Sequence, residues 1–190
     1  MGNDRRIKKT DKAIRKAFID LLSGKPFAEI TIQDIADKAD ISRSTFYDHY
    51  TDKYQLIDTI YSEITERFFE MAEIYFNPRS HEDKKMMARK ALDRVIGDAD
   101  SIRVLMNLEE PGWDLASRIQ TAMKPMCLKY LEKEDRDKFN LGNEFVAGFY
   151  TFTMTYSMQW IAEHQNIEDF PGMLELSTDL SSFFYKRDGK

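Results

Sequence analysis

Side chains able to perform acid–base, nucleophilic or metal chemistry are few and scattered in this sequence of 190 residues. Its three histidines, His49, His81 and His164, lie far apart, and none belongs to an HExxH or ExxH pattern. The single cysteine, Cys127, stands between two apolar residues, which predicts a buried, inert thiol in a reducing compartment. We therefore predict a protein that is not an enzyme and needs no cofactor.

One row of carboxylates has a spacing that could hold a metal ion. Glu63, Glu66, Glu70 and Glu73 recur every three or four residues, so they share one face of a helix. No histidine accompanies them, and rows of charge on a helix are usually a solvated face. We therefore predict no metal site.

A second set of polar residues has the types that contact nucleic acids. In residues 42–50, Phe46 and Tyr50 are four apart and pack inward on one face of a short helix. The hydrogen-bonding side chains left to point outward suit phosphates and base edges: Arg43, Ser44, Thr45, Tyr47 and His49. This pattern predicts a DNA-contacting helix.

The surrounding elements form a helix-turn-helix pattern. Apolar residues at helical spacing predict a first helix over 10–22, which Gly24-Lys25-Pro26 ends. Thr31 and Asp34 stand in capping-box register for a second helix, and Asp40-Ile41 makes a tight turn. Ser42 caps the short third helix, which in such a unit lies in the major groove.

The remaining sequence also reads as helix, so we predict an all-α fold of about nine helices. A long fourth helix runs from Thr51-Asp52 to Asn77-Pro78, and five more lie near 80–97, 99–109, 112–133, 141–165 and 170–186. The helix near 141–165 is apolar nearly all round and must be covered on both sides, most simply by a second copy of the chain. The last helix adds apolar residues to this expected dimer interface: Leu174, Leu176, Leu180, Phe183 and Phe184.

Charge divides the chain into a basic end and an acidic body. The net charge is −5, but residues 1–50 hold ten Lys and Arg against eight Asp and Glu, a balance of +2, and residues 51–190 carry −7. The basic residues before the helix-turn-helix supply counter-charge for DNA phosphates. No apolar stretch has the length of a signal sequence or a membrane span, so we expect a cytoplasmic protein without membrane contact.

Residues 30–56 closely resemble the DNA-binding domain of the TetR/AcrR family of bacterial transcriptional regulators. The hallmark residues are Phe46, Tyr47, His49, Tyr50 and Lys53. Two positions depart from the family pattern. Asp40 replaces the usual turn glycine, although Asp tolerates left-handed backbone, and Tyr50 replaces the usual Phe, so its hydroxyl must reach solvent or a partner.

The resemblance implies a three-helix DNA-binding domain over 1–53 and a helical effector-binding and dimerisation domain over 54–190. The chain would be a homodimeric repressor that binds double-stranded operator DNA. Carried over by position, its DNA-binding residues are Thr31, Gln33, Ser42, Arg43, Ser44, Thr45, Tyr47, His49 and Lys53, of which Tyr47, His49 and Lys53 bind phosphate.

The segment 80–165 is rich in soft, polarizable side chains that suit a pocket for a small, largely apolar or aromatic effector. Ordinary core packing is the alternative for each of them. The effector candidates are Met106, Trp113, Met123, Met126, Phe149, Phe152 and Tyr156. A second reading of the whole protein is a TetR-like co-activator that works through a protein partner.

Overall fold

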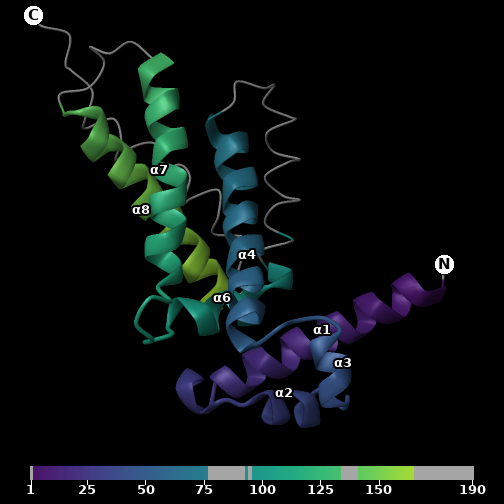
Figure 1. Ribbon diagram of the computed structural model, residues 1–190. Coiled ribbons are helices and arrows are strands. Elements are labelled where there is room, and N and C mark those ends of the chain that lie inside the picture. The colour runs from purple at the N-terminus through teal and green to yellow at the C-terminus, as the bar shows by residue number, and fades with distance from the viewer. Residues whose placement is uncertain (1, 77–92, 94–95, 134–140, 165–190) are drawn as a thin grey trace, which may run out of the picture. The chain divides into compact units, whose positions relative to one another are not determined.

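The computed structural model describes residues 2–76, 93, 96–133 and 141–164 (Figure 1). All regular secondary structure in these ranges is helical, which confirms the all-α class. Seven α-helices and one 3-10 turn are seen there, fewer than the nine predicted for the whole chain. They are α1 (Gly2–Leu22), η1 (Phe27–Glu29), α2 (Ile32–Lys38), α3 (Arg43–Tyr47), α4 (Lys53–Phe76), α6 (Ala99–Met106), α7 (Leu115–Lys133) and α8 (Asn143–His164). The helix predicted near 170–186, with its apolar residues, and most of that near 80–97 lie outside the described residues.

The first helix follows its predicted stop signal, since α1 ends at Leu22, before Gly24-Lys25-Pro26. The described part of α4 reaches Phe76, and the predicted stop at Asn77-Pro78 lies outside the described residues. Between α6 and α7 the prediction left only two residues, but the helices end at Met106 and restart at Leu115. The reason is the turn around Pro111 and Gly112, where Gly112 has a φ of +84° that ends regular helix.

The chain forms two compact units, which we call the head and the body. The head comprises residues 1–64 and 107–113, and the body comprises 65–106 and 114–190. The division falls inside α4, whereas the predicted domain boundary was residue 53. The first turns of α4 belong to the head, and in them Leu56, Ile57 and Tyr61 are fully buried.

The head is built on the apolar faces of its short helices. The first helix packs on α2, and α2 packs on α3. Ile14 and Phe18 of α1, Ile35 of α2 and Phe46 of α3 are all fully buried. Burial of this size contributes about 1.5–3 kcal/mol for each large apolar side chain, which outweighs the low intrinsic stability of five- and seven-residue helices.

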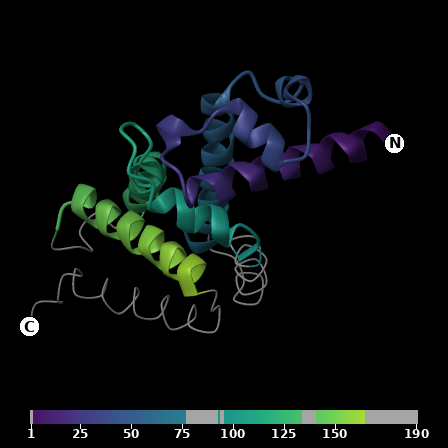
Figure 2. The same ribbon diagram turned by 90° about the horizontal axis from the view of Figure 1, so that it is seen from below.

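In the body, α7 packs along α8, and α6 contacts both helices (Figure 2). Cys127 of α7 is buried, and burial raises the pKa of its thiol to about 11, which fits the predicted inert thiol. Along α8, one face is buried through residues such as Val146, Met158 and Ile161. None of the helices in the described ranges is long and apolar enough to cross a membrane.

Large aromatic side chains of α8 remain exposed. Phe145, Phe152 and Tyr156 are 58%, 60% and 57% exposed, and the rings of Phe152 and Tyr156 stack at 6.4 Å. These residues are spaced by seven and four, so they form one stripe along the helix. We call them the α8 stripe.

Candidate nucleic-acid interface

The helix-turn-helix unit begins with the predicted capping box. The Thr31 hydroxyl accepts a hydrogen bond from the Asp34 N–H at 3.1 Å, and the Asp34 carboxylate accepts one from the Thr31 N–H at 2.8 Å. Lys25 donates to the same carboxylate at 2.8 Å. These bonds, from Lys25 first and Thr31 second, lower the pKa of Asp34 to about 2. The start of α2 is therefore held by charge as well as by geometry.

Asp40 takes the left-handed backbone expected of it, with a φ of 53°. The Ile41 N–H donates to the Ala36 carbonyl at 3.0 Å, and the Asp40 N–H donates to the Asp37 carbonyl at 3.2 Å. This pair of bonds is a Schellman motif, which closes the end of α2 and reverses the chain. The turn geometry is kept even though the family's glycine is absent.

Ser42 caps α3 as predicted and anchors a small hydroxyl cluster. Its Oγ accepts a hydrogen bond from the Thr45 N–H at 3.1 Å and lies 2.7 Å from the Ser44 hydroxyl and 2.9 Å from that of Thr45. Arg43 and Tyr47 are exposed beside them. The structure thus brings polar side chains together at the start of α3, with Phe46 directed into the core.

Two further predicted DNA contacts, Gln33 and His49, already have partners within the head. The Gln33 amide donates to the Asp37 carboxylate at 2.6 Å, one turn along α2. The His49 side chain is only 12% exposed, and its Nδ1 lies 4.0 Å from Oδ1 of Asp11. The sequence placed His49 on the outer face. The structure instead turns it toward α1, and its phosphate contact stays a prediction.

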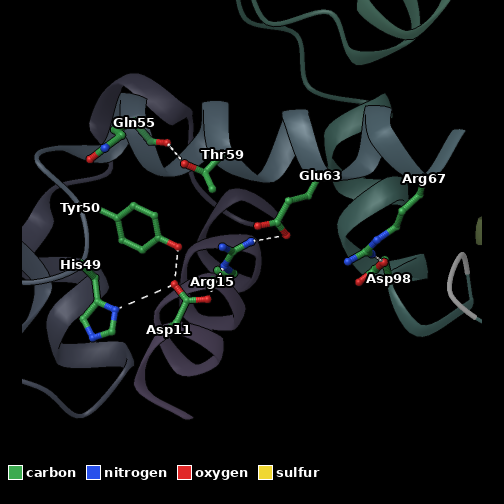
Figure 3. Close-up of polar contacts among 9 residues, drawn as sticks. All are labelled: Asp11, Arg15, His49, Tyr50, Gln55, Thr59, Glu63, Arg67 and Asp98. Atoms are coloured by element: carbon green, nitrogen blue, oxygen red, sulfur yellow. Dashed lines mark hydrogen bonds and ion pairs between the residues drawn. The ribbon is translucent and has the colours of Figure 1, made fainter. Parts of the chain in front are cut away.

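Tyr50 connects the end of the helix-turn-helix to α1 and α4 (Figure 3). Its hydroxyl donates to Asp11 at 2.5 Å, Asp11 accepts from Arg15 at 2.7 Å, and Arg15 donates to Glu63 of α4 at 2.7 Å. Burial, together with the bond to Asp11, raises the pKa of Tyr50. We call Asp11, Arg15, Tyr50 and Glu63 the Tyr50 network. Glu63 is thus part of an ion pair rather than of a metal-binding row.

The Tyr50 network was missed by sequence reasoning, apart from the statement that the Tyr50 hydroxyl needs a partner. A four-residue spacing of Asp11 and Arg15 was a local signal for one of its bonds. The bonds to Tyr50 and Glu63 join residues 39 and 48 positions apart, so no local pattern announces them.

Lys53, predicted to contact phosphate, has backbone partners within the head. Its ammonium donates to the carbonyls of Phe27, Ala28 and Ile30 at 2.7, 3.1 and 2.8 Å and lies 4.6 Å from the centre of the Phe27 ring. An ammonium has three N–H donors, and here each has an acceptor. Lys53 therefore ties the start of α4 to the connector between α1 and α2, and its phosphate contact stays a prediction.

The cations of α1 extend beyond the head's core. The first fully buried residue of α1 is Ile14, and residues 4–9 are all exposed. Arg5, Lys9 and Lys12 recur at four and three residues, so they share a face of the helix. Because Asp11 accepts a hydrogen bond from Tyr50, this extension begins beside the residues that follow α3.

The predicted effector residues do not share one location. Met123 is fully buried in α7, while Met106, Met126 and Phe149 are half-buried on α6, α7 and α8. Phe152 and Tyr156 belong to the exposed α8 stripe. Trp113 lies in the head, where its ring approaches those of Phe27, Tyr54 and Tyr61. Among the described residues, no group of three or more His, Cys, Asp or Glu could hold a metal ion.

Residues 14–60 match a protein family described as bacterial regulatory proteins, tetR family. The matched stretch contains all nine residues predicted to contact DNA and excludes the first thirteen. An uncharacterized HTH-type transcriptional regulator, YxbF from Bacillus subtilis (strain 168), is 32% identical over 132 residues, which are 69% of this chain and 34% of YxbF. The chain thus spans about a third of the length of this curated relative.

Three solved structures share the fold. A TetR transcriptional regulator from Streptococcus agalactiae 2603V has a TM-score of 0.57 at 24% identity, over 95% of this chain and 97% of the other. NalD from Pseudomonas aeruginosa, the secondary repressor of the MexAB-OprM multidrug efflux pump, has a TM-score of 0.59 at 15% identity, over 96% of this chain and 100% of the other. FadR from Bacillus halodurans, a fatty acid degradation regulator, has a TM-score of 0.62 at 14% identity, over 90% of this chain and 93% of the other.

Proposed function

Because this chain belongs to the TetR family of bacterial regulatory proteins, we propose that it binds operator DNA as a homodimer and represses transcription until an effector binds. The helix-turn-helix reads the operator with the start of α3. The body carries the dimer surface and the effector site. Each of these assignments rests on a separate part of the chain and has its own test.

The observation that carries DNA binding is the exposed, pre-organised start of α3. Ser42 fixes the first turn, and the Arg43 guanidinium has no hydrogen bond or ion pair with any other described residue, so it is available to a base edge or a phosphate. Tyr47 is 49% exposed on the same short helix. A rigid backbone with uncommitted donors is the arrangement that major-groove reading requires.

The α8 stripe supports dimerisation. Three exposed aromatic rings along one helix form an apolar surface that is unusual for a soluble monomer. A two-fold axis brings the same stripe from a second copy against it, so that one surface serves both protomers. We therefore assign Phe152 and Tyr156 to the dimer interface rather than to an effector pocket.

The effector site is proposed for the soft side chains where α6, α7 and α8 pack. Met123 and Met126 lie on α7, Met106 at the end of α6, and Phe149 on α8. Unbranched methionines adapt to apolar ligands of different shapes, which suits a small apolar or aromatic effector. Such a ligand changes operator affinity only if it binds one state of the protein more tightly than the other.

Selection of a DNA ligand tests the DNA-binding proposal directly. The full-length protein is used to enrich sequences from a random duplex library, and the Kd of the best sequence is measured across salt concentrations. We expect one enriched motif with two-fold symmetry and a log Kd that depends steeply on log salt. Failure to enrich any sequence, or binding that ignores salt, would contradict the proposal.

Two variants divide the α3 contacts by kind. Tyr47→Ala is expected to weaken binding to every sequence, because it removes a phosphate contact. Arg43→Ala is expected to lose about 1–3 kcal/mol of discrimination at one base pair. If the protein enriches DNA only after a second protein from the same cells is added, the co-activator alternative is the better account.

Sedimentation at micromolar concentration tests the dimer. The wild-type chain is expected to sediment as a dimer, and Phe152→Asp to shift it toward monomer while the helical content is unchanged. A wild-type monomer would refute the assignment of the α8 stripe. Lys129→Gln, an exposed change on α7 outside the α8 stripe, is the control that leaves the dimer intact.

A further inference from the structure

The connection between α6 and α7 belongs to the head although both of its neighbours belong to the body. Residues 107–113 form one compact unit with residues 1–64, and the chain on either side of them forms the other unit. The connection is a turn in which the Trp113 N–H donates to the Glu110 carbonyl at 3.0 Å, and Gly112 supplies the positive φ that such a turn needs. We call residues 107–113 the α6–α7 turn.

Trp113, the last residue of the turn, completes an aromatic cluster in the head. Its ring centre lies 5.5 Å from that of Tyr61, 6.0 Å from Phe27 and 6.4 Å from Tyr54. The Tyr61 hydroxyl, on a fully buried side chain, donates to the Trp113 carbonyl at 2.7 Å. Both the side chain and the backbone of Trp113 are therefore fixed to α4.

The cluster supports the connector that leads into α2. Phe27 begins η1, and the residue after η1, Ile30, is followed at once by the helix cap Thr31. Lys53 donates to the carbonyls of this connector. Burial lowers the pKa of Lys53, and the negative charge of Glu110 in the α6–α7 turn offsets part of this effect. The α6–α7 turn thus contacts the connector through the Trp113 ring, and the negative charge of its Glu110 acts on Lys53.

We propose that Trp113 is a positioning residue for operator recognition. It does not contact DNA. Its indole covers Phe27, so that the connector and the Lys53 ammonium keep one arrangement and α2 and α3 stay ready to bind. Without the indole, fewer heads are in the binding arrangement at any moment, and the apparent Kd rises as that fraction falls. This inference rests on the proposed DNA-binding function.

The test compares four full-length variants on the selected operator. Trp113→Ala removes the indole, Trp113→Phe keeps a ring, and Tyr61→Phe removes only the hydroxyl that holds the Trp113 carbonyl. Trp160→Ala is the matched control, because Trp160 is a half-buried tryptophan of α8 in the body. Operator Kd, its salt dependence and hydrogen exchange of residues 27–31 are measured for each variant.

We expect Trp113→Ala to raise the operator Kd about tenfold, since three ring contacts are lost together. The salt dependence should stay that of the wild type, because no phosphate contact is removed. Exchange at residues 27–31 should become faster. Trp113→Phe should recover most of the affinity, Tyr61→Phe should lose a few-fold, and Trp160→Ala should bind within about twofold of the wild type.

Several outcomes would overturn the proposal. A Trp113→Ala protein that binds as the wild type does, a loss of salt dependence in step with affinity, or an equal loss in Trp160→Ala would each do so. If Trp113→Ala does not fold, wild-type binding by both Trp113→Phe and Tyr61→Phe refutes it. If the wild type binds no duplex, the DNA-binding function fails on its own, and unchanged exchange at 27–31 in Trp113→Ala then refutes the positioning role.

Discussion

Replacing Lys53 by Met separates a structural lysine from a phosphate-binding one. Methionine keeps the length of the apolar stem and removes all three N–H donors. The Phe27 and Ile30 side chains are buried, whereas Ala28 is exposed, so water can replace the lost partner most easily at the Ala28 carbonyl. Leaving a buried acceptor without a donor costs about 1–3 kcal/mol. The Phe27 carbonyl keeps a second donor, the Ile30 N–H at 3.2 Å, so the Ile30 carbonyl is the one left unpaired. The expected loss in the free energy of unfolding is therefore about 1–3 kcal/mol.

Urea denaturation followed by circular dichroism measures this loss. Lys38→Met is the control, because Lys38 is an exposed cation of α2 and its replacement should change the free energy by less than about 0.5 kcal/mol. A Lys53→Met protein as stable as the control would refute the structural role drawn from the three carbonyl distances. In that case the Lys53 ammonium would be available for a phosphate contact.

Operator binding by the same variant addresses the other role. A lysine that neutralises one phosphate contributes about 0.9 to the slope of log Kd against log salt for each head. If Lys53 is only structural, Lys53→Met weakens binding with an unchanged slope. A slope reduced by about 1.8 in a dimer would show that the ammonium also reaches DNA.

Three further predictions follow from the described contacts. Asp40→Gly should raise the free energy of unfolding by about 0.5–1 kcal/mol, because glycine adopts a φ of 53° without strain, and Asp40→Val should lower it; thermal melting distinguishes them. Because the pKa of Asp34 is lowered to about 2, its stabilising bonds are complete above about pH 4 and are lost as the pH falls toward 2, so Asp34→Asn should flatten the acid limb of a stability profile, and an unaltered limb would contradict this. Joint replacement of Arg5, Lys9 and Lys12 by Gln should reduce the salt slope by up to about 2.7 per head without changing the enriched motif, whereas replacing the exposed body lysine Lys129 should not affect it.

Local features of the helix-turn-helix were predictable because their causes lie within a few residues. The capping box needs only Thr31 and Asp34, the turn only the tolerance of Asp40 for a positive φ, and the start of α3 only the Ser42 hydroxyl. Each is a short-range hydrogen-bonding rule, so one sequence suffices to apply it. The position of the capped, polar start of α3 could therefore be predicted from the sequence alone.

Features that depend on residues far apart in the sequence were not predictable in the same way. Lys53 has the charge of a phosphate ligand, and only the carbonyls of residues 27–30, more than twenty positions earlier, give it another role. Trp113 has the composition of an effector-site residue, and only the fold places it in the head. The orientation of His49 toward Asp11 likewise needs α1 to be in position first.

The discontinuous head limits how far this protein can be treated as a set of interchangeable modules. A chimera that joins residues 1–64 to a foreign sensor domain leaves out the α6–α7 turn, so Phe27, Tyr54 and Tyr61 lose the ring that packs against them. To keep this packing, the foreign sensor domain would have to supply a loop with an aromatic residue in the place of Trp113. In this chain, the head proposed to read DNA is therefore complete only together with a segment that lies in the sequence between two helices of the body.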